Sequence, residues 1–387
     1  HAAGCGREPG MKRLPPQSLL LLAALPALYA PAVFGSGVFF DRDIYNYWKP
    51  HVDWALASLA SGQTIAWNPG LQFGLPFLAD PNFQVFYPPT WLLIILSPPA
   101  FYAVLVVGHG LLGAFGMNRL LRAYSFENGA LVGGLAFALS GPFVSVANLW
   151  HHYCTAAWIP WVLCALREVN RSEGRAFRPL ALFAAAAALA GSAETLAMAV
   201  VIGVFIEGAD FMSATRLRAL IASLGIAACL ASVQWLPAWE ALRTSARDTF
   251  TPIQKLSWSV SPAELATVVT RSPGPVAGAS VGDPQAPAAP LMTSVYLGAF
   301  LAPFAVLGGI VFPRAALPLA LFLAGSLGRH LGAGAEVVAA LIPFRYPAKL
   351  LIGASIAWAI LVGAGVHTAT RRTSSGAGPV GALVTLL

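Results

Sequence analysis

Two aspartates near the start of the chain are the residues best suited to chemistry. Asp41 and Asp43 directly follow the first apolar run, and Arg42 stands between them as an ion partner. Carboxylates at a membrane face are costly unless they are paired or used, so we expect a function for this pair. One of them could be the general base that takes a proton from an acceptor hydroxyl. The pair could instead hold a divalent cation, Mg²⁺ or Mn²⁺, against a phosphate leaving group.

A second group of polar residues lies in short segments between later apolar runs. The candidates for substrate contacts are His151, His152, Glu194, Glu240 and Arg243. Two adjacent histidines make no metal site without further ligands, so we predict no metal site from them. Each of these side chains could instead be an ordinary solvated or anchoring residue of a loop.

Two cations, Arg345 and Lys349, stand just before the last long apolar run. The planar fork of arginine matches the oxygens of a phosphate group. We therefore expect these two residues to bind the phosphate of a lipid carrier. Anchoring of both side chains at the membrane interface is the alternative that the sequence leaves open.

The chain must be embedded in a membrane, because its composition leaves too little polar surface for a water-soluble protein. Of its 387 residues, 57% are hydrophobic and 10% are charged, whereas soluble domains carry about 25% charged residues. The net charge of +7 does not indicate nucleic-acid binding, since Arg and Lys cluster in short turns between apolar runs, the pattern of cytoplasmic loops. The four cysteines form no CxxC pair, so the sequence favours neither a zinc site nor a redox motif.

Apolar runs long enough to form helical spans must hold these residues in place. Placing every Arg-rich turn on the cytoplasmic side makes the runs alternate without conflict and leaves the N-terminus cytoplasmic. All the candidate site residues then fall on the outer face. The predicted spans are residues 18–34, 100–117, 130–147, 154–166, 179–190, 196–206, 220–236, 295–312, 317–327 and 350–366.

We expect residues 18–387 to form one all-α domain, a polytopic transmembrane bundle of about 10 to 11 spans. Two long outer loops, 35–99 and 237–292, interrupt it. Within the first loop, residues 44–59 have the periodicity of an interfacial amphipathic helix. Residues 86–96 are apolar but too short to span, which favours a surface or re-entrant helix.

The two ends of the sequence differ from those of a complete protein. Residues 1–17 are interpreted as a leader, since Met11-Lys12-Arg13 before an apolar run is typical of the start of a bacterial membrane protein. Residues 1–10 would then lie upstream of the true start. The sequence ends at Leu387, within an apolar run, and we therefore expect a C-terminal part to be missing.

An ordered set of segments carries a resemblance to a known family. The segments are DIYNYWKP (43–50), GQTIAWNPGLQFGLPFLADPNFQVFYPP (62–89), GGLAFALSGPFVSVANLWHHYCTAAWIPWVL (133–163), AGSAETLAM (190–198), SVQWLPAWEALRTSAR (232–247) and IPFRYPAKLL (342–351). Together they make the chain similar to the YfhO-like family of bacterial membrane proteins, which belong with the GT-C type of glycosyltransferases. Members of this family are usually longer and often carry a C-terminal outer domain.

The resemblance implies a GT-C-like fold whose first extracytoplasmic loop carries the catalytic aspartate. On that basis Asp43 is the catalytic residue and Asp41 its neighbour, while Trp67, Asn68 and Tyr87 shape the sugar site. The donor would be a sugar linked to polyprenyl phosphate. The Asp41-Arg42-Asp43 arrangement departs from the paired carboxylate of soluble nucleotide-sugar enzymes, which argues against a bound metal.

The function expected from the sequence is transfer of one sugar to an acceptor outside a bacterial inner membrane. The acceptor could be a cell-wall polymer or other glycan, a lipid or a protein, and Asp43 would deprotonate it. A transporter or flippase is an alternative, but transporters place polar residues at the bilayer midplane and often show internal repeats. The sequence shows neither feature. A non-catalytic membrane scaffold for cell-envelope polymers is the other alternative.

Overall fold

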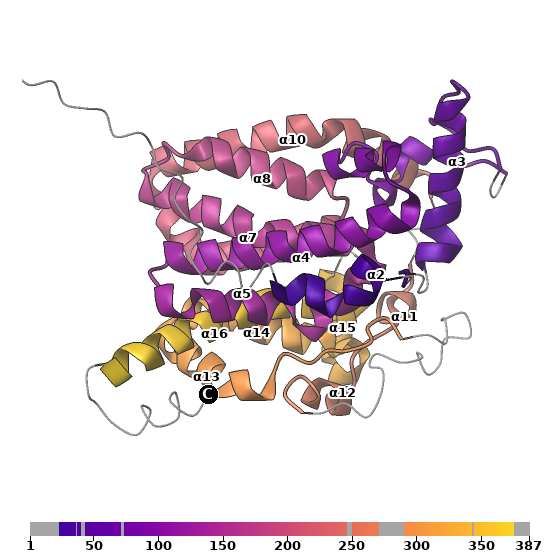
Figure 1. Ribbon diagram of the computed structural model, residues 1–387. Helices are drawn as coiled ribbons and strands as arrows, with labels where there is room; N and C mark the ends of the chain where they lie inside the picture. Colours follow the sequence, from indigo (N-terminus) through magenta and orange to yellow (C-terminus); the bar gives the residue numbers. More distant parts are fainter. Residues whose placement is uncertain are drawn as a thin grey trace, which may run out of the picture.

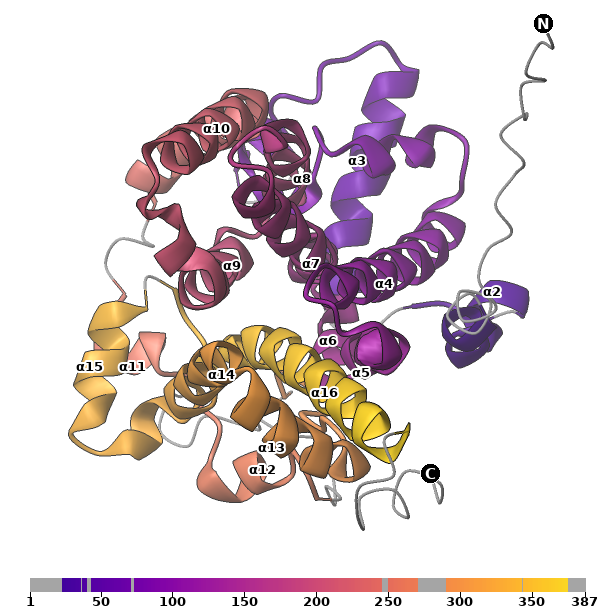
Figure 2. The same ribbon diagram turned by 90° about the vertical axis from the view of Figure 1, so that its left-hand side faces the viewer.

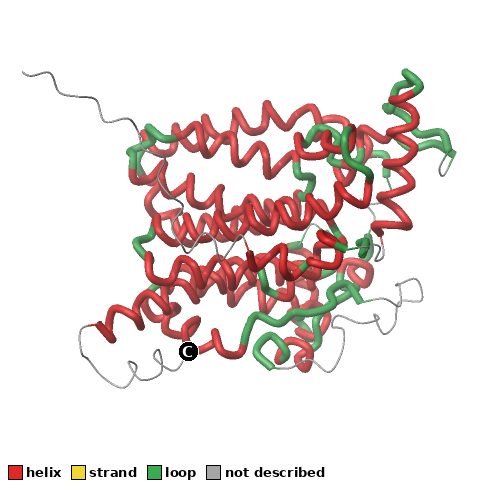
Figure 3. The backbone as a smooth tube through the Cα atoms, viewed as in Figure 1, coloured by secondary structure: helices red, strands yellow, loops and turns green. Residues whose placement is uncertain are grey.

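The computed structural model describes residues 23–35, 37–39, 43–70, 73–245, 250–270, 290–342 and 344–374. Within these ranges all the labelled secondary-structure elements are helices (Figure 3). Strand pairing in the described part is limited to an isolated antiparallel bridge between Asn68 and Leu75. The predicted all-helical class is therefore confirmed.

Many of the helices are joined by short connections, and longer stretches separate α3 from η2 and α12 from η9. Residues 23–28 are helical. The α-helices are α2 (Ala30–Phe34), α3 (Lys49–Ala60), α4 (Pro98–Ala123), α5 (Ala130–Ala138), α6 (Gly141–Ser145), α7 (Trp150–Arg171), α8 (Phe177–Leu189), α9 (Ala193–Glu207), α10 (Ala214–Arg243), α11 (Pro252–Lys255), α12 (Pro262–Ala266), α13 (Ala302–Val311), α14 (Pro313–Ser326), α15 (Gly334–Leu341) and α16 (Leu350–Ser374). Short 3₁₀ or π segments are η1 (Ile44–Trp48), η2 (Phe77–Ala79), η3 (Pro81–Phe83), η4 (Pro88–Ile94), η5 (Glu127–Gly129), η6 (Val146–Asn148), η7 (Gly208–Met212), η9 (Ala299–Leu301), η10 (Gly328–Leu331) and η11 (Pro347–Lys349).

The long helices lie side by side in a bundle, and α3 stands across one end of it (Figure 1). Viewed along the bundle, α4, α7, α8 and α10 form one group, and α13, α14 and α16 form another (Figure 2). Helix α9 contacts α7 on one side and α14 and α16 on the other, so it joins the two groups. Because the long helices lie side by side, the bundle has two ends, and α3 lies at one of them (Figure 1).

Four of the described helical stretches are long and apolar enough to cross a membrane, which supports an integral membrane protein. They are Pro98–Ala123, Glu127–Asn148, Ala214–Arg243 and Pro347–Arg372. Two others, Phe177–Leu189 and Ala299–Val311, are apolar but shorter. The predicted total of 10 to 11 spans and the predicted orientation stay predictions.

Helix α16 is the buried centre of the second group, and glycines let its neighbours approach it closely. Within its most apolar window, 94% of the residues are buried inside the protein. A Cβ atom on Gly308 of α13 would overlap the backbone carbonyl of Leu361, and one on Gly365 would overlap that of Phe304. Small residues at such contacts allow backbone-to-backbone packing where no larger side chain fits.

Three helix boundaries differ from the sequence prediction, each for a local reason. Helix α10 continues through Pro237 to Arg243 instead of ending at the proline, as membrane helices tolerate proline when neighbours satisfy the freed backbone. The predicted span 130–147 is broken before Gly141-Pro142, where α6 begins. Helix α7 begins at Trp150, so His151 and His152 lie in its first turn and not in a loop.

The first long loop folds onto the end of the bundle through aromatic side chains. The helix predicted over 44–59 is present as η1 followed by α3. The ring of Phe83 stacks on those of Tyr47, His51 and Phe77 at centroid distances of 5.3, 4.5 and 4.6 Å. Residues 88–94 form a 3₁₀ segment within the stretch predicted as a surface helix. This packing holds η1, α3, η2 and η3 together, and the ring of Trp48 stacks on that of Phe101 in α4 at 5.9 Å, which attaches the loop to the bundle.

Candidate functional site

Three of the predicted site residues meet at one end of the bundle. The Nζ atom of Lys349 lies 2.7 Å from Oε2 of Glu194, and Nε2 of His152 lies 3.2 Å from the same oxygen. They come from η11, α9 and α7, which are far apart in the sequence. We call His152, Glu194 and Lys349 the carboxylate cluster. The side chains of His152 and Lys349 are 3% and 10% exposed, so the ion pair is largely removed from water.

Local sequence explains how α9 presents Glu194. The hydroxyl of Ser192 caps the helix by accepting a hydrogen bond from the backbone N–H of Thr195. This cap places Glu194 in the first turn, where a negative charge is stabilised by the helix dipole. Gly191 in the preceding turn has φ +98°, a backbone conformation that glycine adopts without strain.

His152 is held in one orientation by its neighbours. Its Nδ1 lies 2.7 Å from the Ser192 hydroxyl, while its Nε2 faces Glu194. Burial, together with the nearby Lys349 ammonium, holds the pKa of His152 well below its usual value. The imidazole is therefore neutral near pH 7, donating its Nε2 proton to the carboxylate and accepting at Nδ1.

A second cation, Arg345, lies next to this cluster. Its guanidinium stacks over the rings of Phe250 and Tyr346, at 4.3 and 4.8 Å from their centroids. The Nζ atom of Lys349 lies 5.2 Å from the centroid of the same Tyr346 ring. Among the residues that the structure describes, no carboxylate lies within ion-pair distance of Arg345. Among the described residues its guanidinium thus contacts aromatic rings and no carboxylate.

The first loop contacts the helix ends that carry the carboxylate cluster. The indole N–H of Trp150 donates to the backbone carbonyl of Asn82, and the side-chain amide of Gln84 donates to that of Ala190 at 2.6 Å. The ring of His151 lies 4.2 Å from that of His152. The loop therefore packs against the helix ends from which the carboxylate cluster comes.

Asp43 occupies the position before η1, is partly exposed, and forms neither a hydrogen bond nor an ion pair with the other described residues. Trp48, at the end of η1, packs its ring 6.1 Å from that of Trp150, which links this part of the loop to the start of α7. Asp41 lies outside the described residues.

The remaining predicted site residues lie elsewhere. Tyr87 is buried, where its hydroxyl accepts from Trp158 at 2.6 Å and pairs with Nε2 of His109 at 2.7 Å. Asn68 is buried at its bridge, whereas Trp67 is 53% exposed beside Gly74. Glu240 and Arg243 are exposed on the last turns of α10. The structure does not bring these five residues into the carboxylate cluster.

Sequence reasoning missed Ser192 and Tyr346, which hold the cluster together. Ser192 could have been found, because a serine just before an apolar helical run, with a glutamate in the first turn, is typical of a helix cap. Tyr346 has φ +76°, and its backbone N–H donates to the carbonyl of Lys255 at 3.0 Å. No residue type in the sequence signals that distant contact.

The structure describes no group of three or more His, Cys, Asp or Glu side chains able to hold a metal ion within its defined ranges. The chain matches no protein-family model, and neither a curated protein nor a solved structure matches it. The chemistry must therefore be argued from the residues. They offer a partly exposed carboxylate, an arginine with no counter-ion among the described residues and a largely buried ion pair, all at one end of a membrane-embedded bundle.

Proposed function

We propose that this protein is a membrane glycosyltransferase that moves a sugar from a polyprenyl-phosphate donor to an acceptor outside a bacterial inner membrane. The observation that supports this most is Arg345. Its guanidinium has no carboxylate partner among the described residues, and it lies beside the largely buried Glu194–Lys349 pair at the head of an apolar helix. The ordered segments that resemble the YfhO-like family support the same proposal.

Arg345 binds the donor phosphate in this proposal, because its planar fork can donate two hydrogen bonds to phosphate oxygens. Lys349 is already held by Glu194, so it adds positive potential next to the phosphate and positions Tyr346. The apolar surface of the neighbouring helices accommodates the polyprenyl chain. The donor is thereby fixed with its sugar directed toward the first loop.

Asp43 acts as the general base. It takes the proton of the acceptor hydroxyl while the hydroxyl oxygen forms a bond to the anomeric carbon. The bond between that carbon and the phosphate oxygen breaks, and polyprenyl phosphate leaves with the bonding electrons. Direct displacement on the face opposite the phosphate inverts the anomeric configuration. Asp43 suits this task because it has no hydrogen-bond or ion-pair partner among the described residues.

The experiment is a transfer assay in membranes that contain the wild-type chain or its Asp43→Asn variant, with radiolabelled polyprenyl-phosphate sugars as donors. Label should move to a polymer, lipid or protein with wild type only. The matched control is Asp53→Asn, because Asp53 is an exposed carboxylate ten residues further on that pairs with Lys49. No transfer from any donor, with all three proteins alike, would favour a transporter or a scaffold.

A further inference from the structure

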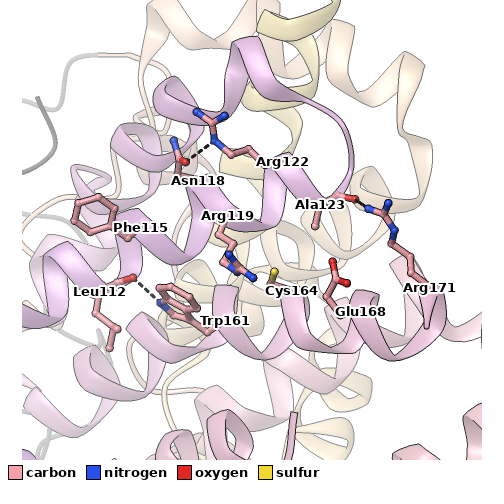
Figure 4. A pocket seen from close by; sticks show the side chains of 10 residues that line it. All are labelled: Leu112, Phe115, Asn118, Arg119, Arg122, Ala123, Trp161, Cys164, Glu168 and Arg171. Carbon is pink, nitrogen blue, oxygen red and sulfur yellow. Dashed lines mark hydrogen bonds between the residues drawn. The ribbon is translucent and has the colours of Figure 1, made fainter. Parts of the chain in front are cut away.

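A pocket at the opposite end of the bundle forms between α4 and α7 (Figure 4). It has a volume of about 650 Å³. It lies near the C-terminal ends of both helices, whereas His152 lies in the first turn of α7. Sixteen residues separate His152 from Glu168 in the pocket, or roughly 24 Å along the helix. The pocket is therefore separate from the carboxylate cluster.

The pocket is made by matching faces of two helices that run in the same direction. The lining residues on α4 include Leu112, Phe115, Arg119 and Arg122, and those on α7 are Trp161, Cys164, Glu168 and Arg171. Both series advance by three, four and three residues, so each set lies on one helix face. Hydrogen bonds fix the two faces in register, from Trp161 to the Leu112 carbonyl at 2.8 Å and from Arg171 to that of Ala123 at 3.0 Å.

The character of the lining changes along the pocket. The part toward the middle of the helices is apolar and aromatic and is lined by Leu112, Phe115 and Trp161. The part toward the helix ends carries three arginines and one glutamate. The lining charge is therefore +2, counted as three positive groups less one negative. Figure 4 shows the Arg119 side chain in the space between the helices, near Cys164. An occupant with an anionic head and an apolar tail matches this gradient.

Two of the arginines that line the pocket have no counter-ion among the described residues. Arg119 and Arg171 form no ion pair with the described carboxylates, and Glu168 forms none with the described cations. By contrast, Arg167 and Arg216 at the same end both face carboxylates. Arg119 and Arg171 are both exposed, so their guanidinium groups can reach an anionic headgroup that lies beside the apolar part of the pocket.

We propose that this pocket binds an anionic phospholipid, with its phosphate between Arg119 and Arg171 and one acyl chain along Leu112 and Phe115. Helix α4 is one of the stretches long and apolar enough to cross a membrane, so the pocket opens where lipid is available. Basic pockets between membrane helices on the Arg-rich side are suited to such headgroups. This inference does not depend on the proposed transferase activity.

The test uses the purified full chain in detergent, with lipid binding measured by native mass spectrometry and by the rise in melting temperature. The probes are phosphatidylglycerol, phosphatidylcholine and inorganic phosphate. We expect phosphatidylglycerol to bind at least tenfold more tightly than phosphatidylcholine, because only the former has a net negative head. Inorganic phosphate alone should give no protection, since it cannot fill the apolar part of the pocket.

The variant to compare is the double substitution Arg119→Gln and Arg171→Gln, which should reduce phosphatidylglycerol binding at least tenfold. Arg218→Gln is the matched control, since Arg218 is an exposed arginine at the same end on α10, and it should bind as wild type does. Leu112→Trp fills the apolar part without changing charge and should also weaken binding. Equal binding of the two lipids, protection by inorganic phosphate, or a double variant that binds like Arg218→Gln would overturn the proposal.

Discussion

Glu194 joins three segments of the chain, because it accepts from Lys349 and from His152 through one oxygen atom. A carboxylate in this position balances an ammonium that is almost fully buried. If Glu194 were neutral, Lys349 would keep its charge without a partner. The ion pair therefore links η11, which directly precedes α16, to the start of α9.

Glu194→Gln should destabilise the protein. Removing one partner of a fully buried pair costs about 3–5 kcal/mol, and the partial exposure of this side chain lowers our expectation to about 2 kcal/mol. Thermal unfolding in detergent measures the effect. Glu173→Gln is the control, because its partner Arg216 lies at the surface, and it should leave the melting temperature nearly unchanged. Equal melting temperatures for the two variants would contradict this role of Glu194.

The neutral state of His152 predicts how stability changes with pH. The pKa of His152 is lowered in the folded protein, chiefly by burial, so the unfolded chain takes up the proton first as the pH falls. The contribution of neutral His152 to the free energy of unfolding is then fully present above about pH 6.5. It falls below that pH, by about 1.4 kcal/mol between pH 7.5 and 5.5. His152→Gln should remove this part of the pH dependence of the melting temperature. A variant with the same pH profile as wild type would show that His152 is not buried in the neutral form.

At the scale of elements, the contact of α13 with α16 rests on glycine. Gly308→Ala should destabilise the protein by about 2 kcal/mol, because the added methyl group overlaps a backbone carbonyl that cannot move alone. Gly225→Ala is the matched control, since a Cβ atom there meets nothing within 4 Å. It should stabilise α10 by about 1 kcal/mol through helix propensity. Melting temperatures that shift equally in both variants would contradict the packing described for α16.

Much of the helical framework could be predicted, because apolar runs and the 3.6-residue period are local signals. The helix over 44–60 and the pair α8 and α9 lie close to their predicted positions. The end of α10 could not be predicted, since the tolerance of Pro237 depends on its neighbours. The sequence named His152, Glu194 and Lys349 as candidates but could not show that they meet. That result depends on helix packing between segments about 150 residues apart.

The whole molecule has two chemically different ends. One carries the first loop, Asp43, the carboxylate cluster and Arg345. The other carries most of the arginine-rich turns and the α4–α7 pocket. The positive-inside pattern predicts that the second end faces the cytoplasm, so that the proposed transfer takes place outside.

Thiol labelling tests this orientation. In a chain whose four cysteines are replaced by serine, Gln63→Cys should react with a membrane-impermeant reagent in intact cells. Arg218→Cys should react only after the membrane is opened. Both positions are exposed, in the first loop and at the start of α10. Labelling of both from the same side would contradict the predicted topology.

The most direct measurement compares donor binding and sugar transfer in the same preparations of wild type, Asp43→Asn and Arg345→Gln. We predict that Asp43→Asn binds the polyprenyl-phosphate sugar as wild type does but transfers it at least about 100-fold more slowly, the usual loss for a general base. Arg345→Gln should instead lose about tenfold or more in donor affinity. Transfer by Asp43→Asn within a few-fold of wild type would contradict the proposed mechanism, and a wild-type protein that binds and transfers no such donor would contradict the proposed function.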